Sequence, residues 1–276
     1  MLPFLFIAAG ALFVGSGIKK PKPATVLKKG GEVKKIEPPK PVSKEVEYIT
    51  IKKRWKKKKE SIANLATNIR SLRYNITTDL QSDNDKVFLT ALAVELMDKT
   101  AERVGNDDSA SNGHFGITGL NKKHVTVEGN KVTLKYTGKS GVEHEKVITD
   151  ERLASNIKKA KEISPNKYLL CTSDNFRIKS DRINRYLSDY DVTAKDLRGF
   201  AANKWIVNKL KEIEIADTDK ERQKQFNTIA KSVAKKVGHG NATLKKHYMI
   251  PELESDFVTK GKIIDIKFSN GGHVLN

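Results

Sequence analysis

Five side chains in this sequence have the types that a phosphoryl transfer needs, and in chain order they are Arg103, Lys139, Arg198, His239 and Tyr248. A tyrosine hydroxyl is a nucleophile that can form an ester with phosphate. Two guanidiniums suit the non-bridging oxygens, on which negative charge builds up. An amine can protonate the leaving oxygen, and an imidazole can donate a further hydrogen bond. The set predicts cutting and resealing of a DNA strand through a phosphotyrosine.

Each of these residues also has an ordinary structural interpretation. An arginine at a helix end commonly caps carbonyls, a lysine in a turn is solvated, and a tyrosine near a chain end packs. The other histidines are interpreted as structural only, and they are His114, His124, His144, His247 and His273. The prediction therefore depends on the ordered set and not on any single residue.

No cofactor and no metal are predicted. Cys171 is the single cysteine, so an intrachain disulfide and a cysteine-based zinc site are both excluded, as is typical of a reducing compartment. The segment GKSG resembles the end of an ATP-binding phosphate loop, but Thr133 stands where that loop needs a glycine. His144 and Glu145 lack a second histidine at the spacing of zinc proteases. Neither ATP nor zinc is supported.

The charge of the chain indicates a polyanionic partner. The formal net charge is +19 over 276 residues, and residues 19–59 alone contain sixteen Lys or Arg against four Glu. The remainder is only moderately basic, so a nucleic-acid interaction of the folded part must rest on particular residues.

The N-terminal residues predict a membrane anchor followed by a linker. Residues 1–18 carry no charge and precede three lysines, which predicts a short single span with the body facing the cytoplasm or an equivalent interior. A cleaved signal peptide or a buried helix is the alternative. Residues 19–47 hold five of the eight prolines and predict a flexible tether. Its lysines could contact phosphate, anionic lipid or only solvent.

Residues 48–276 are predicted to form one folded domain of the α+β class, mainly helical, with a small three-stranded antiparallel sheet. A short strand, YITIKKRW, is expected first, followed by a helix and then by a strongly apolar helix that ends at Gly105. The strands are HVTVEG, NKVTLKYTG and GVEHEKVIT. Further helices are expected at 150–163, 180–189, 194–213, 218–236 and 240–247.

This layout gives each chemical residue a position. Arg103 is expected at the end of the long helix, Lys139 at the tip of a hairpin and Arg198 in the first turns of a helix. His239 and Tyr248 lie nine residues apart across a short helix. Tips and ends of elements can meet at one phosphate.

Five motifs resemble, in order, the catalytic domain of the type IB DNA topoisomerases, particularly their compact poxvirus-like and bacterial branch. They are ALAVELMDKTAERVGN, HFGITGLNKKHV, YTGKSG, DRINRYLSDYDVTAKDLRGFAANK and VAKKVGHGNATLKKHYMIP. The resemblance starts near Arg54 and Trp55 and covers about four-fifths of the chain. It implies the helical fold that this family shares with the tyrosine recombinases.

The resemblance also implies an activity and its residues. Arg103, Lys139, Arg198 and His239 match the four catalytic side chains of the family, and Tyr248 matches its nucleophile. The implied reaction is relaxation of supercoiled double-stranded DNA by a monomer, with single-strand cleavage, strand rotation and religation. The residues expected to contact DNA are Phe115, Lys122, Lys123 and Lys195.

Two alternatives remain open. A tyrosine recombinase shares the chemistry, but it usually carries histidine three residues before the second arginine, where this chain has Lys195 in KDLR. A DNA-binding tether with little catalysis is the other alternative. One departure from the family concerns the β-rich lobe that normally precedes the Arg-Trp region, because only YITIKKRW would remain of it here. Either the clamp is open on one face and binds DNA more weakly, or the polybasic tether wraps the duplex in place of the lobe. In both cases DNA binding is expected to weaken steeply with salt.

Overall fold

Nine helices and three strands make up the part of the chain that the computed structural model describes, which is residues 44–264, with side chains from Trp55 onward. The helices are α1 (Lys44–Asp79), α2 (Asp85–Thr100), α3 (Asp107–Ser111), α4 (Glu151–Ile163), α5 (Ser180–Ser188), α6 (Ala194–Lys211), α7 (Asp219–Lys236), α8 (Asn241–His247) and α9 (Glu252–Lys260). The strands are β1 (Val125–Glu128), β2 (Lys131–Thr137) and β3 (Glu143–Thr149). The predicted α+β class, mainly helical with one small antiparallel sheet, is confirmed.

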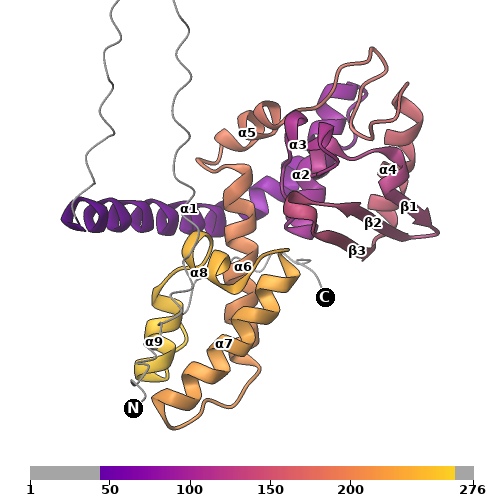
Figure 1. Cartoon of the computed structure of the whole chain (residues 1–276). Coiled ribbons are helices and arrows are strands. Elements are labelled where there is room, and N and C mark those ends of the chain that lie inside the picture. The colour runs from indigo at the N-terminus through magenta and orange to yellow at the C-terminus, as the bar shows by residue number, and fades with distance from the viewer. Residues whose placement is uncertain (1–43, 265–276) are drawn as a thin grey trace, which may run out of the picture. The chain divides into compact units, whose positions relative to one another are not determined.

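Helix α1 replaces the strand that was predicted around residues 48–55, and that prediction is wrong. The 36 residues of α1 contain neither glycine nor proline, so nothing interrupts the helical hydrogen bonds. Buried isoleucines and leucines recur every three or four residues from Ile62 to Ile76, which is the helical period. The helix also begins at Lys44, inside the segment predicted as linker. Its N-terminal turns extend beyond the neighbouring elements (Figure 1).

Helix α2 ends five residues earlier than predicted. Asn84 caps its start by accepting hydrogen bonds from the N–H groups of Lys86 and Val87. At its end Ala101 adopts the left-handed conformation with φ of 54°, and its N–H bonds to the carbonyl of Met97. Arg103 therefore lies in a non-helical segment beyond the helix and not at its last turn.

The sheet has the order β1-β2-β3, with both pairs antiparallel. Thr137 pairs with Glu143 at the end of the second hairpin, and residues Lys139–Gly141 form a short 3-10 turn between them. Ser140 and Gly141 have φ of 66° and 73°, so two successive left-handed residues reverse the chain. Lys139 occupies this hairpin tip, as predicted.

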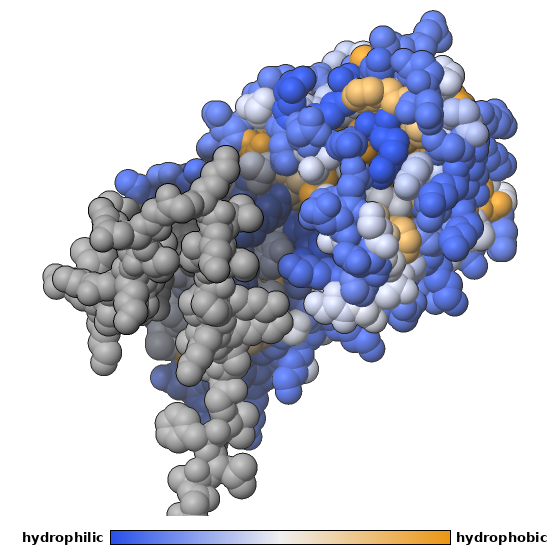
Figure 2. Space-filling view, turned by 45° about the horizontal axis from the view of Figure 1, so that its top comes forward, coloured by the Kyte–Doolittle hydropathy of each residue, from blue (hydrophilic) through white to orange (hydrophobic). Residues whose placement is uncertain are grey.

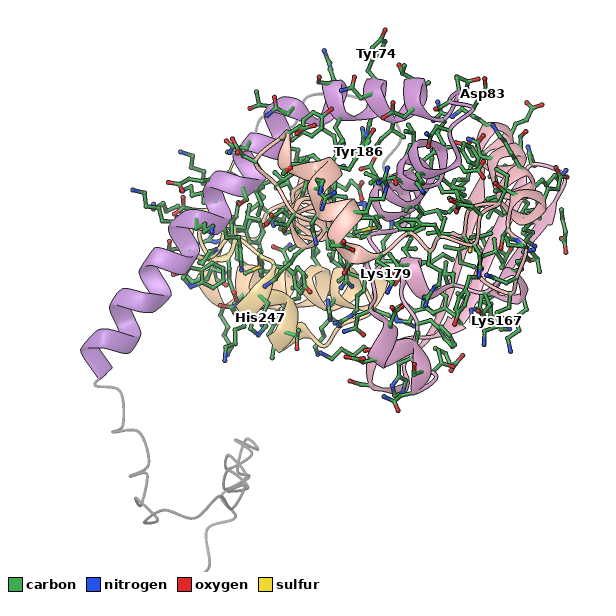
Figure 3. The ribbon with its side chains drawn as sticks, turned by 90° about the horizontal axis from the view of Figure 1, so that it is seen from above. Tyr74, Asp83, Lys167, Lys179, Tyr186 and His247 are labelled. Carbon is green, nitrogen blue, oxygen red and sulfur yellow. The ribbon has the colours of Figure 1, made fainter. Side chains whose placement is uncertain are left out.

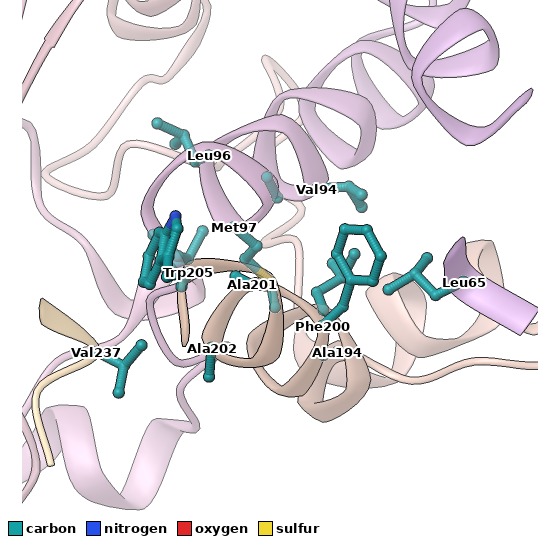
Figure 4. Packing of buried hydrophobic residues seen from close by; sticks show 14 of the residues in the cluster. Leu65, Val94, Leu96, Met97, Ala194, Phe200, Ala201, Ala202, Trp205 and Val237 are labelled. Carbon is teal, nitrogen blue, oxygen red and sulfur yellow. The ribbon is translucent and has the colours of Figure 1, made fainter. Parts of the chain in front are cut away.

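Helices α1, α2 and α6 form the centre of the core. Figure 4 shows Leu65 of α1, Met97 of α2, and Phe200 and Trp205 of α6 in one buried cluster, with Val237 beside it. Because α2 is buried around its whole circumference, it is a rigid support for the segment that follows it. The sheet and α4 contribute a continuation of the same cluster.

The predicted membrane anchor is not supported by the structure. No helix among residues 44–264 is long and apolar enough to cross a membrane. The face in Figure 2 is mostly hydrophilic, with hydrophobic residues as small separate spots. Residues 1–18, on which the prediction of a single-pass anchor rested, and most of the predicted linker 19–47 lie outside the described residues. The localisation at a membrane is therefore withdrawn.

Candidate active site

Arg198 is held in the interior by main-chain carbonyls from two distant segments. It lies in the second turn of α6 and is only 3% exposed. Its Nε donates to the carbonyl of Ala101 at 2.6 Å, and its Nη2 donates to the carbonyl of Val237 at 2.5 Å. Burial lowers the pKa of Arg198, yet a guanidinium stays protonated in proteins. The side chain therefore joins three segments while it keeps its charge.

Tyr248 directly follows α8 as its C-cap residue, and its hydroxyl faces Arg198. The Nη1 of Arg198 lies 3.5 Å from Oη of Tyr248, and the guanidinium carbon lies 5.4 Å from the ring centre. The tyrosine ring stacks on the imidazole of His239, with 4.7 Å between the ring centres. Lys195, one turn before Arg198 in α6, has its Nζ 5.9 Å from the same ring. Three cationic or polar side chains thus lie around one tyrosine, and Arg198 is the one that reaches its hydroxyl.

Arg103 and His239 form a direct pair. Nη2 of Arg103 lies 3.0 Å from Nδ1 of His239. Because arginine can only donate, Nδ1 is the acceptor and the proton of a neutral imidazole is on Nε2. Burial, followed by the charges of Arg198 and Arg103, lowers the pKa of His239 to about 3. Nε2 is buried and has no hydrogen-bond partner within residues 44–264, so it can donate to a ligand oxygen.

Two adjoining clefts bring the remaining residues together. The larger has a volume of about 760 Å³ and is lined by Arg103, Lys139, Lys195, His239 and Tyr248, among others. The smaller, of about 260 Å³, is lined by Arg103, Lys139, Lys195, Arg198 and Tyr248, together with Phe115. All five predicted catalytic residues therefore line one or both clefts. The arrangement can bind a phosphodiester beside the tyrosine hydroxyl.

The predicted DNA contacts divide into two groups. Phe115 and Lys195 line the clefts, and the N–H of Phe115 is bonded to the carbonyl of Thr137 at the end of β2. Lys122 and Lys123 line none of the clefts described for this part of the chain. The ammonium of Lys122 bonds to the carbonyl of Ser164 at 2.6 Å, whereas Lys123 is exposed. Lys122 therefore has a structural role, which the sequence did not indicate.

A third cleft on the α1 side of Tyr248 was not predicted. It has a volume of about 290 Å³ and is lined by Lys57 and Lys58 of α1, Lys195 of α6, and Lys246 and His247 of α8. Figure 3 shows His247 at the side of the molecule where α8 lies near α1. The basic run KKRWKKKKE could have indicated this cleft. Because a strand was expected at its start, the lysines were not recognised as lying on one helix.

Two further buried residues support the site and were missed. Asn203 of α6 donates to the carbonyl of Tyr248 at 2.8 Å and accepts from the N–H of Ile250 at 2.8 Å. It is fully buried, so these bonds hold the main chain that carries the tyrosine. His144 of β3, predicted to be only structural, bonds through Nδ1 to Glu102 at 2.9 Å, next to Arg103.

The side chains described near Tyr248 do not form the kind of group that binds a metal ion. Within the described residues no three His, Cys, Asp or Glu side chains are grouped so that they could hold a metal ion. The groups around Tyr248 are instead arginine, lysine and histidine. The arginines and lysines can neutralise phosphate charge directly, and the neutral imidazole can donate a hydrogen bond.

The site thus has a tyrosine hydroxyl beside two arginines, a histidine and a lysine. These are the side-chain types that transfer of a phosphodiester to tyrosine would need. A family model described as the catalytic core of eukaryotic DNA topoisomerase I matches residues 49–258, and the chain belongs to this family.

Individual relatives are similar at modest identity. DNA topoisomerase 1B of Acanthamoeba polyphaga mimivirus is 29% identical over 162 residues, which are 54% of this chain and 48% of that protein. DNA topoisomerase 1 of Candida albicans is 29% identical over 197 residues, which are 69% of this chain and 25% of that protein. The matched region thus spans about half of one relative and a quarter of the other.

Among solved structures, a post-cleavage complex of the XerH site-specific recombinase with its palindromic difH substrate has a TM-score of 0.42 and 18% identity. The match covers 68% of this chain and 47% of that one.

Proposed function

We propose that this chain relaxes supercoiled double-stranded DNA by cutting one strand, allowing it to rotate and resealing it through a 3′-phosphotyrosyl ester of Tyr248. The observation that carries the proposal is the convergence of Arg103, Lys139, Arg198 and His239 on clefts that meet at this tyrosine. Membership of the DNA topoisomerase I family supports the same activity.

Cleavage begins with attack of Oη of Tyr248 on phosphorus. The Oη–P bond forms as the bond from phosphorus to the 5′ oxygen breaks. The tyrosyl proton passes to water in the cleft, because Nδ1 of His239 already accepts from Arg103 and Arg198 is itself a donor. Lys139 at the hairpin tip gives a proton to the departing 5′ oxygen.

Negative charge on the non-bridging oxygens is stabilised by donors that are already oriented. Nη1 of Arg198 points to the tyrosine hydroxyl, while its other nitrogens are fixed by two carbonyls. Nε2–H of His239 is the second oriented donor, and Arg103 holds its tautomer. Removal of one such donor typically lowers a rate about 10²–10³-fold.

Religation is the reverse reaction. The free 5′ hydroxyl attacks phosphorus and returns its proton to Lys139, the bond to Oη of Tyr248 breaks, and the tyrosine regains a proton from water. The phosphotyrosine conserves the free energy of the broken phosphodiester, so the cycle needs no ATP. Charge neutralisation by the two arginines takes the place of a divalent metal.

The test is relaxation of a negatively supercoiled plasmid with EDTA present and ATP absent. The wild-type chain should relax the plasmid and should form a covalent adduct with a suicide substrate, and Tyr248→Phe should do neither while it still binds duplex DNA. Tyr74→Phe is the matched control, because Tyr74 is 73% exposed on α1 and lies far from His247 in Figure 3.

The outcomes separate the alternatives. Strand exchange between two specific sites without relaxation would assign the chain to the recombinases instead. Binding of duplex DNA by the wild type without any adduct would make it a DNA-binding protein and refute the proposed catalysis.

A further inference from the structure

His144 is a buried side chain that lies between two segments bearing catalytic residues. It is 5% exposed and lies on β3. A Cβ placed on Gly138 would come within 2.5 Å of its Nε2, and one placed on Gly238 would come within 2.5 Å of its Cε1. These glycines immediately precede Lys139 and His239 in the sequence. The imidazole thus packs directly against the main chain of both segments.

A third catalytic segment reaches the same imidazole through Glu102. Oε1 of Glu102 lies 2.9 Å from Nδ1 of His144, and the carboxylate is only 1% exposed. Burial alone would raise the pKa of Glu102, but the hydrogen bond and charge of His144, with Lys146, lower the pKa overall. The carboxylate therefore stays ionised and can only accept, so Nδ1 of His144 carries a proton. Glu102 immediately precedes Arg103.

Two neighbours hold this pair in place. The ring of Tyr136 on β2 stacks on His144, with 5.2 Å between centres and 5° between planes. The ammonium of Lys146 lies 3.4 Å from Oε1 of Glu102 and also donates to the carbonyl of Lys236 at the end of α7. The ion pair is thereby linked to the helix that precedes His239.

We propose that His144, together with Glu102, is a positioning residue that sets the placement of Arg103, Lys139 and His239 relative to one another. Three segments far apart in the sequence meet at this one imidazole, and in each the neighbouring residue belongs to the proposed active site. His144 does not touch the reacting atoms. The inference rests on the proposed function for its kinetic consequence, but its structural consequence can be measured without any activity.

The first test measures the imidazole of His239 in the free protein. In the protein made with ¹⁵N-labelled histidine, the NMR signals of the His239 ring should be those of a neutral imidazole with its proton on Nε2. These signals are assigned by their loss in His239→Gln. His144→Ala should shift these ¹⁵N signals toward the average of the two tautomers, because the segment of His239 is released. Unchanged signals would overturn the inference, whatever the activity of the chain.

The second test measures the rate of adduct formation on a suicide substrate. His144→Ala and Glu102→Gln should slow this step about 10- to 100-fold, as expected when reacting groups move by up to an ångström. His144→Asn keeps a donor near the position of Nδ1 and should recover most of the rate. His124→Ala is the matched control, since this buried histidine bonds through Nδ1 to the N–H of Asn121 within its own turn.

A double-mutant comparison tests the contact between Gly138 and His144 directly. Gly138→Ala should slow adduct formation in the wild-type background, because the new Cβ meets Nε2 of His144. The same change should have little further effect in His144→Ala, where that clash is removed. Additive effects, or full activity of His144→Ala in a chain whose wild type forms the adduct, would refute the positioning role. Failure of the wild type to form an adduct would refute the proposed function, and the ¹⁵N measurement would still decide the inference.

Discussion

Arg103 donates a hydrogen bond to Nδ1 of His239 across 3.0 Å, and this bond determines which imidazole nitrogen carries the proton. The imidazole is therefore a donor at Nε2 and not a base. Burial, together with the positive charges of Arg198 and Arg103, lowers the pKa of His239 and keeps the ring neutral. Its contribution to stability should consequently depend on pH in a specific way.

The pH dependence of stability should reveal the lowered pKa of His239. Above pH 6.5 neither the folded nor the unfolded chain protonates this ring, so its contribution is constant. Between about pH 6.5 and pH 3 only the unfolded chain takes up the proton, so the folded state loses stability as the pH falls. Urea unfolding at several pH values should show this loss for the wild type relative to His239→Gln. A difference between the two proteins that stays constant from pH 7.5 to pH 4.5 would contradict the prediction.

Lys139 should be needed for protonation of the leaving oxygen. Lys139→Ala is expected to slow cleavage of an ordinary strand about 10²–10⁴-fold, the usual contribution of a general acid. A substrate with sulfur at the 5′ bridging position should restore most of the rate, because a thiolate leaves without a proton. Single-turnover cleavage of both substrates measures this. Lys135→Ala on the same hairpin, where Lys135 is exposed and paired with Glu145, should behave like the wild type. Equal losses on both substrates would remove Lys139 from this role.

Arg198 should not be replaceable by lysine. Lysine keeps the charge but cannot reach the two carbonyls and the tyrosine hydroxyl together. Arg198→Lys should slow adduct formation about 10²–10³-fold and should lower the free energy of unfolding by about 1–3 kcal/mol, since a buried carbonyl loses its donor. Arg185→Lys, at an exposed position of α5, should change neither quantity. Wild-type rates in Arg198→Lys would show that charge alone suffices.

Asn203 should hold the main chain of the nucleophile in place. Asn203→Leu preserves the volume but leaves the carbonyl of Tyr248 and the N–H of Ile250 without partners. We expect a loss of about 1–3 kcal/mol in stability and slower adduct formation. Asn156→Ala, a change of another buried asparagine on α4, serves as the comparison. If both variants lose stability but adduct formation is equally fast, Asn203 does not position the tyrosine.

Lys122 and Lys123 are adjacent, but their replacement should affect different properties, stability for Lys122 and DNA binding for Lys123. Lys123→Ala removes an exposed charge, and if this lysine neutralises one phosphate the slope of log affinity against log salt should decrease by about 0.9. Lys122→Ala removes the donor to Ser164 and should lower stability while it leaves the slope unchanged. Duplex binding at several salt concentrations, with thermal unfolding of the same proteins, measures both effects. An unchanged slope in Lys123→Ala would exclude it as a DNA contact.

The sequence predicted most elements correctly because their patterns are local. The strands of the hairpin with Lys139 and the helices from α4 to α8 follow alternating or helical periods with capping residues, as in Thr193 and Asp196 at the start of α6. The helices α3 and α9 were missed, and α3 gives no periodic signal because it has only five residues, none of them buried. The end of α2 was misplaced because Ala101, which is not a glycine, adopts the left-handed conformation.

The supporting residues of the site could not be predicted for a different reason. His144 meets Glu102 across 42 residues, and Asn203 meets Tyr248 across 45. Neither partner is recognisable before the chain is folded, because a buried histidine or asparagine has no local pattern of its own. The chemical residues were predictable through their order in the family motifs, whereas the polar groups that hold them depend on tertiary contacts.

Helix α8 restricts the length of the chain between two residues of the site. It occupies seven of the eight positions that separate His239 from Tyr248. Each residue added to a helix rotates everything beyond it by about 100°. A single insertion in α8 would therefore turn the tyrosine away from Arg198, whereas the loop between α6 and α7 can lengthen without moving either residue. Natural variants of this chain should thus differ in length at residues 212–218 and keep the interval between His239 and Tyr248 constant.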